Sequence, residues 1–206
     1  MLKSKIKTPL TIETILEHPS IWTGKEISKI PQKTLDSGFE ILDKKLGGWH
    51  FGTINEIIVQ NQGIGEFSLL LPAIAEVSKT DSGVVLINPP YIPYAPCLLF
   101  NKIDLKKILV VNVSRYHDLL WTMEQVLRAE NCSIAITWTC EMNNPIFRRL
   151  QLAAKSGNSI GFYFNNIFSK RSPAPYRFYI NAYKQTTNVK IIKYRGNNTL
   201  QSFKIR

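Results

Sequence analysis

Gly63 and Gly65 stand between an apolar run, residues 53–59, and a mostly apolar stretch with the composition of a helix. A strand, a glycine-rich loop and a helix in this order form a phosphate-binding loop when lysine and then serine or threonine follow the second glycine. If Gly65 is that second glycine, the positions of the motif's first glycine, lysine and hydroxyl hold Gln60, Glu66 and Phe67. The loop therefore keeps glycines but lacks the residues that handle phosphate charge and magnesium.

Glu66 places a carboxylate where a triphosphate would lie. Two like charges about 4 Å apart repel by roughly 4 kcal/mol at an effective dielectric constant of about 20. A tight turn from a strand into a helix explains both glycines without any ligand. We therefore predict a degenerate phosphate loop, and we expect no ATPase activity, no catalytic residue and no cofactor. Pro72 either kinks the following helix or marks its start.

Short runs rich in β-branched residues alternate with helical patterns from Thr34 onward. The runs at residues 53–59, 83–88, 108–113, 133–138 and 159–164 are typical of strands buried on both faces. Helices are predicted within residues 115–131, with Glu124, Gln125 and Arg128 on the outer side, and within residues 144–158. The second helix has Asn144 as its candidate N-cap, Pro145 at its first position and Gly157 beyond its end. The alternation predicts a mostly parallel sheet with helices on its faces.

Residues 175–183 and 188–196 alternate polar and apolar side chains and predict an antiparallel β-hairpin that extends the sheet. We divide the chain into an N-terminal segment (1–33), a core with the degenerate phosphate loop (34–169), and a basic β-hairpin extension of the same domain (170–206). A short helix is predicted in the N-terminal segment, ending at His18-Pro19.

The net charge of +11 arises in the last third of the chain. Twelve of the 26 Lys and Arg residues follow Glu141, and no Asp or Glu does. This imbalance favours nucleic acid or an acidic protein surface as a partner, although a solvated basic face is the simpler explanation. No apolar stretch is long enough to span a membrane, so a cytoplasmic protein is expected. Cys97, Cys132 and Cys140 have no metal-site spacing and are interpreted as buried free thiols.

The stretch "LDSGFEILDKKLGGWHFGTINEIIVQNQGIGE" resembles the start of a RecA-type ATPase core. The blocks "IWTGKE", "LDSGFEILDKKLGGW", "GIGEFSLLLPAIA", "INPPYIPYAP", "RRLQLAAKSGNSIGF" and "VKIIKYRG" resemble, in this order, the ImuA proteins. These are RecA-like accessory factors of damage-induced mutagenesis, related to the cell-division inhibitor SulA. The resemblance implies an α/β RecA-like core of the phosphate-loop type, with a mostly parallel sheet, a short N-terminal helical segment and a C-terminal β-hairpin.

RecA-type enzymes also use a glutamate after the second strand to activate water and an aspartate on a later strand to hold magnesium. Here the segment "INPPYIPYAP" contains no carboxylate, and Glu141 comes only after the end of the run at residues 133–138. Three elements of phosphoryl transfer are therefore missing, which predicts a non-enzymatic protein.

RecA-like cores bind DNA through loops beyond the fourth and fifth strands, which the resemblance aligns with "TCEMNNPIF" and "NNIFSKRSPAP". The candidates for contacting DNA or a partner are Arg148, Arg149, Phe168, Lys170, Arg171, Lys193 and Arg195. Alternatively, one of Arg148 and Arg149 faces solvent while the other pairs with Glu141. Lys190 and Lys193 fall on opposite faces of their strand unless the strand is bulged.

The rigid segment containing Pro89, Pro90, Tyr91 and Tyr94 is a candidate docking site for a protein, because prolines lower the ordering cost and aromatic side chains supply contact area. Alternatively, it is a stiff lid that fills the space left by the nucleotide.

Two functions remain open. The first is an adaptor of the SOS response that supports error-prone translesion synthesis. Its implied partners are the ImuB polymerase homologue, a replicative-type error-prone polymerase, RecA and DNA. The alternative is a SulA-like inhibitor of cell division that binds FtsZ. An ATPase with an atypical loop ranks last.

Overall fold

The computed structural model describes residues 33–138, 142–169, 172–183, 186–194 and 197–205. The predicted N-terminal segment lies outside the described residues, apart from Lys33.

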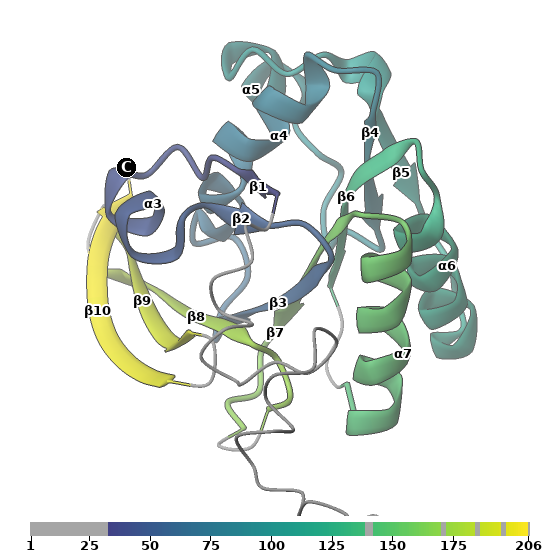
Figure 1. The fold of residues 1–206 in the computed structure, drawn as a ribbon. Coiled ribbons are helices and arrows are strands. Elements are labelled where there is room, and N and C mark those ends of the chain that lie inside the picture. The colour runs from purple at the N-terminus through teal and green to yellow at the C-terminus, as the bar shows by residue number, and fades with distance from the viewer. Residues whose placement is uncertain (1–32, 139–141, 170–171, 184–185, 195–196, 206) are drawn as a thin grey trace, which may run out of the picture. The chain divides into compact units, whose positions relative to one another are not determined.

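An eight-stranded sheet organises the described residues, with strand order β10-β9-β8-β3-β7-β6-β4-β5 (Figure 1). Its strands are β3 Thr53–Val59, β4 Gly83–Ile87, β5 Ile108–Val111, β6 Cys132–Trp138, β7 Ile160–Asn165, β8 Tyr176–Tyr183, β9 Thr186–Tyr194 and β10 Asn197–Ile205. Neighbours from β8 to β5 are parallel, and β9 is antiparallel to both of its neighbours, β8 and β10. The short strands β1 Thr34–Leu35 and β2 Trp49–His50 form a separate antiparallel pair.

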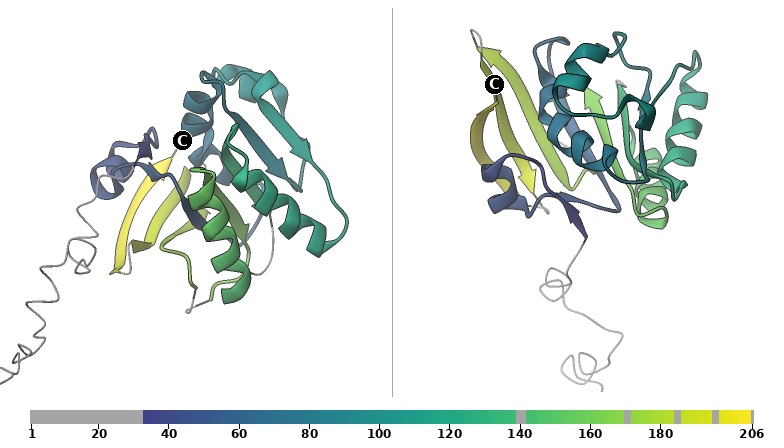
Figure 2. Two further views of the ribbon diagram at one scale, coloured as in Figure 1. Left: turned by 45° about the vertical axis from the view of Figure 1, so that its right-hand side comes forward. Right: turned by 90° about the horizontal axis from the view of Figure 1, so that it is seen from above.

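Helices cover both faces of the sheet. They are α3 Glu40–Leu46, α4 Leu71–Ser78, α5 Ala95–Phe100, α6 Tyr116–Arg128 and α7 Asn144–Ser156, with the 3-10 helices η1 Glu66–Leu69 and η2 Leu105–Lys107. Apolar side chains of α3 and α4 pack with one face of the strands, and those of α6 and α7 pack with the other. Figures 1 and 2 show α6 and α7 side by side on that second face.

The predicted strands are confirmed with small shifts of their ends, and so is the hairpin formed by β8 and β9. The burial expected for the run at residues 108–113 is wrong: β5 is the edge of the sheet and exposes Leu109 and Val110. β10 was not predicted. A mostly parallel α/β sheet with a C-terminal antiparallel extension is therefore the observed architecture.

Two details of the predicted helices need correction. The N-cap of α7 is Asn143, whose side-chain oxygen accepts a hydrogen bond from Ile146 N at 3.0 Å, so Asn144 is the first helical residue. Glu124 of α6, expected on the outer side, is buried. Pro72 stands in the first turn of α4, so of the two alternatives it marks the start of that helix.

Candidate functional site

The loop after β3 turns tightly at its two glycines. Gly63 and Gly65 have φ angles of 81° and 87°, in the left-handed region that glycine adopts most readily. Thr187 of β9 donates a hydrogen bond from its hydroxyl to Ile64 O at 2.8 Å, which ties the loop to the neighbouring antiparallel strands. A side chain at position 65 would come within 3.0 Å of that same hydroxyl. The sequence thus keeps a tight loop at the carboxyl end of a central parallel strand.

Glu66 turns back into this loop. Its side chain is 6% exposed, and Oε1 accepts a hydrogen bond from Gly63 N at 3.2 Å. A backbone N–H of such a loop would otherwise point at a phosphate oxygen. The carboxylate of Glu66 therefore uses a donor that an anionic ligand would need. The α-helix that follows starts only at Leu71, because η1 intervenes.

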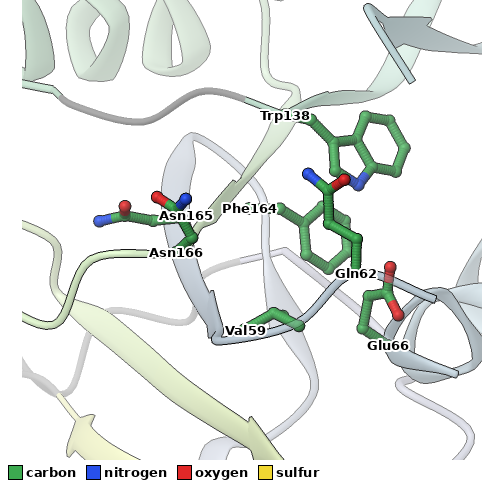
Figure 3. Close-up of a pocket in the computed structure, with 7 residues that line it drawn as sticks. All are labelled: Val59, Gln62, Glu66, Trp138, Phe164, Asn165 and Asn166. Atoms are coloured by element: carbon green, nitrogen blue, oxygen red, sulfur yellow. The ribbon is translucent and has the colours of Figure 1, made fainter. Parts of the chain in front are cut away.

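A cavity of about 70 Å³ opens beside Glu66 and is lined by Val59, Gln62, Glu66, Trp138, Phe164, Asn165 and Asn166. Trp138 and Phe164 stack with their ring centroids 5.0 Å apart. Figure 3 shows the Gln62 side chain lying between Trp138 and Glu66. Among the described residues, Oε2 of Glu66 and Nε1 of Trp138 are buried without a hydrogen-bond partner.

A buried ion pair lies beside this cavity and was not found by the sequence analysis. Glu56 of β3 accepts a hydrogen bond from Nε of Arg177 on β8, and both side chains are almost fully buried. Asn165 at the end of β7 donates from Nδ2 to Glu56 Oε1 at 3.1 Å. Burial, and next the charge of Glu56, raises the pKa of Tyr163 far above its usual range.

Arg177 also contacts described residues between β7 and β8, in one of the two predicted binding loops. Its Nη2 donates to Ser169 O at 2.7 Å, and its guanidinium lies 5.5 Å from the centroid of Phe168. Phe168, a predicted binding residue, is half-exposed, and its ring lies beside the buried guanidinium that pairs with Glu56.

Lys193, another predicted binding residue, is directed toward the same segment and donates from Nζ to Ser172 O at 3.1 Å. Burial, and next the nearby charge of Arg177, lowers the pKa of Lys193. A bulge in β9 pairs Lys193 with Arg177 and Lys190 with Tyr179. Both lysines therefore share one face of the sheet, so the bulged alternative of the sequence analysis is the observed one.

Arg148 and Arg149 lie near the start of α7, and both are exposed. Arg149 donates from Nε to Glu124 Oε2 at 2.9 Å, and Arg128 reaches the other oxygen of Glu124 at 2.7 Å. The pairing of one arginine is thus with Glu124 of α6. Lys170, Arg171, Arg195 and Glu141 lie outside the described residues, so their predicted roles stay predictions.

The predicted docking segment is held at both ends and exposed between them. Asn88 donates from Nδ2 to Val113 O at 2.8 Å and accepts from Val113 N at 2.7 Å, while Leu98 within α5 and Ile103 beyond it are buried. Between these anchors, Ile92 is 93% exposed and Phe100 is 87% exposed. The remaining exposed apolar side chains of this region are Tyr91, Tyr94 and Leu99. Pro89 is half-buried and Pro90 is exposed.

The segment and the loop are neighbours, because a Cβ on Gly63 would lie 4.0 Å from the ring of Tyr91. This contact is what the lid alternative predicts for Tyr91. The exposure of Ile92, Tyr94 and Phe100 fits the docking alternative.

The thiols differ in their surroundings. Cys132 is buried, and burial raises its pKa to about 11. Cys97 is exposed, so its predicted burial is wrong, and Cys140 lies outside the described residues. The described part of the chain holds no cluster of three His, Cys, Asp or Glu residues that could bind a metal ion. None of its helices has the length and apolarity to cross a bilayer.

Comparison with known proteins gives one recurring similarity. No protein-family model matches the chain. Over 111 residues, it is 26% identical to the cell division inhibitor SulA of Yersinia pestis (strain Pestoides F) and to that of Yersinia pseudotuberculosis serotype O:1b (strain IP 31758). The matched region is 54% of this chain and 66% of those relatives. The crystal structure of SulA from Pseudomonas aeruginosa matches with a TM-score of 0.45 and 18% identity, covering 54% of this chain and 96% of that one.

Proposed function

We propose that this protein is a non-enzymatic inhibitor of cell division of the SulA kind, made during the SOS response, and that it acts by binding FtsZ. The sequence similarity to two SulA proteins supports this function. It favours the alternative of the sequence analysis over the adaptor of translesion synthesis, for which no comparison offers support.

The observation that carries the binding role is the exposed apolar surface on residues 91–100. Ile92 and Phe100 are almost fully exposed, and two tyrosines lie between the anchors of the same segment. Exposed apolar groups on a preformed segment lose little conformational freedom on binding, so a larger part of their burial energy appears as affinity. We assign this surface to the protein partner.

The non-enzymatic role is supported by the loop. Glu66 occupies the lysine position and already binds Gly63 N, so both the charge and a backbone donor of a working phosphate site are lost. A protein that inhibits by binding needs neither.

Sedimentation of FtsZ polymers tests the proposal. FtsZ is assembled with GTP, and the amount pelleted is measured as the protein is added. We expect the wild type to lower the pelleted fraction. The variant Ile92→Ser/Tyr94→Ser should weaken inhibition by roughly 30-fold or more, since side chains at the centre of interfaces each contribute about 2 kcal/mol or more.

The matched control is Trp121→Ser, which removes an exposed aromatic side chain from α6 and leaves the docking segment unchanged. The proposal is supported if Trp121→Ser inhibits FtsZ assembly as strongly as the wild type and Ile92→Ser/Tyr94→Ser does not. Undisturbed FtsZ polymers at all protein concentrations overturn it. Loss of damage-induced mutagenesis in a deletion strain that divides normally would favour the adaptor function instead.

A further inference from the structure

The cavity beside the loop has an unbalanced charge. Glu66 is the only charged residue among the seven that line it, and Oε1 alone has a hydrogen-bond donor. Oε2 is buried with no partner among the described residues, and no ion pair there includes Glu66. A carboxylate taken out of water without a full set of donors is costly, so a ligand that supplies N–H groups and positive charge is favoured at this position.

The rest of the lining suits a cation as well. The stacked rings of Trp138 and Phe164 form an apolar, electron-rich wall, against which guanidinium and ammonium groups bind favourably. Asn166 adds a side-chain carbonyl oxygen that accepts hydrogen bonds, and Oδ1 of Asn165 keeps a lone pair beside its bond from Ile167 N at 2.9 Å.

Trp138 Nε1 is a donor and needs an acceptor of its own. Gln62, which lies between Trp138 and Glu66 in Figure 3 and is exposed, can turn its carbonyl oxygen to that donor. Only the carboxylate then needs a partner from outside.

Charge disfavours an anion, and the volume of about 70 Å³ admits a small head group. Among the residues that the structure describes, no lysine or arginine lines the cavity to neutralise a phosphate. Gly63 N, the donor identified in the loop, is already taken by Glu66.

We infer that this cavity is a binding site for a cationic nitrogen group, a guanidinium or a primary ammonium. It therefore prefers a cation, whereas a phosphate loop at the same place in the fold would bind an anion. Glu66 is the anchoring residue, and Trp138 with Phe164 forms the wall. This inference does not depend on the proposed action on FtsZ. The same head group is offered by a lysine or arginine of a docking protein and by a free amine such as agmatine.

The indole N–H of Trp138 allows a direct test. In a ¹⁵N-labelled protein its NMR signal is identified by its absence from Trp138→Phe, and agmatine, inorganic phosphate and magnesium ATP are titrated separately. We expect agmatine to shift this signal in a saturable way. Phosphate and ATP should leave it in place at the same concentrations.

Glu66→Gln keeps the shape of the side chain and removes its charge. We expect it to weaken agmatine binding about tenfold or more, because hydrogen bonds between two charged groups are the strong ones. Glu76→Gln, the same change at an exposed carboxylate on α4, should leave binding unaltered. Circular dichroism of each variant confirms folding. Replacing a buried carboxylate whose Oε2 lacks a donor should not lower the stability of Glu66→Gln, because the amide oxygen can still accept from Gly63 N.

Three results would overturn the inference: no shift with agmatine up to about 10 mM, which corresponds to negligible affinity; equal binding by Glu66→Gln; or a saturable shift caused by phosphate. The affinity also separates the sources of the cation. A dissociation constant of agmatine below about 0.1 mM identifies a free amine as the ligand. Weaker but Glu66-dependent binding, with loss of FtsZ inhibition in Glu66→Gln, identifies a side chain of the partner. Unchanged FtsZ inhibition together with lost agmatine binding shows that the two functions are separate.

Discussion

Glu56 and Arg177 are 1% and 3% exposed, and they form an ion pair between two neighbouring strands. Asn165 and the carbonyl of Ser169 use further hydrogen-bonding positions of the pair. Such a pair contributes little compared with apolar residues of the same size, but losing one partner leaves a buried charge unpaired. The pair therefore makes the sheet sensitive to single substitutions at a site that also holds Ser169, in the segment between β7 and β8.

The first prediction concerns this pair. Glu56→Ala should lower the free energy of unfolding by about 3–5 kcal/mol, because Arg177 remains buried without its partner. The double variant Glu56→Met/Arg177→Met should recover most of this loss. Urea denaturation measures both. Glu76→Gln, which breaks an exposed pair with Lys79, should cost less than about 1 kcal/mol. Equal losses in the single and double variants would contradict the argument.

Single residues also mark where sequence reasoning reached its limit. The position of Glu66 follows from the spacing of the phosphate-loop motif, so its charge reversal could be found without a structure. Arg177 lies 121 positions from Glu56, and no local pattern connects them. The one available signal was an acid inside the otherwise apolar run at residues 53–59, since a buried carboxylate requires a cation. The partner of Arg149 was missed because Glu124 was placed on the outer side of its helix.

At the scale of elements, α6 and α7 pack closely at the point where both helices end. Gly157, directly after α7, has a φ angle of −84°, which any residue adopts. Its importance is the contact: a Cβ there would lie 2.1 Å from the carbonyl oxygen of Leu127 and 2.9 Å from Cα of Arg128. Both atoms belong to the backbone of α6, so a side chain could not be accommodated by rotation of a neighbour.

The second prediction follows from this contact. Gly157→Ala should destabilise the protein by about 1–3 kcal/mol, the usual cost of overpacking. Without the contact, the same substitution at a relaxed backbone position would stabilise by about 0.4–1 kcal/mol. The sign of the change in the free energy of unfolding, measured by urea denaturation, therefore shows whether overpacking or the gain in backbone rigidity dominates. Gly47→Ala, at a left-handed position with open space around it, serves as a control for backbone strain alone.

The elements themselves were largely predictable. Runs of β-branched residues with turn residues on both sides gave five parallel strands, and cap residues gave α7 to within one position. The exposure of β5 could not be predicted, because an apolar run does not report how many neighbours its strand has. The third antiparallel strand, β10, carries a mixed polar sequence that local patterns do not distinguish from a loop.

For the molecule as a whole, the described residues keep a parallel sheet with helices on both faces, and the loops at the carboxyl ends of its strands adjoin a cavity. Sheets of this kind bind ligands at that edge. Composition and motif spacing predicted the layer arrangement. They also predict the loss of phosphate chemistry, which stays a prediction. They could not predict the cavity, because it is built from side chains of three strands, η1 and two loops that meet only after folding.

The third prediction tests the loss of nucleotide binding in the intact chain. Magnesium ATP at millimolar concentration should leave the thermal unfolding midpoint unchanged. A ligand present at about 100 times its dissociation constant would stabilise the folded state by roughly 2.7 kcal/mol and raise that midpoint by several degrees. Differential scanning fluorimetry measures the midpoint, and GTP serves as a second nucleotide. A rise in the wild type that becomes larger in Glu66→Gln, where the repelling charge is removed, would show that nucleotide binds at the loop after all.

The end of the sheet at β5 has a consequence for how the protein behaves in concentrated solution. Among the described strands, none pairs with the outer side of β5. Backbone amide and carbonyl groups on that side are therefore unpaired, next to the exposed apolar side chains of Leu109 and Val110. Such a rim invites a second molecule to continue the ladder. Lys106 and Lys107 stand immediately before the strand, and their like charges repel an approaching identical rim. High salt weakens that repulsion, so self-association should grow with ionic strength.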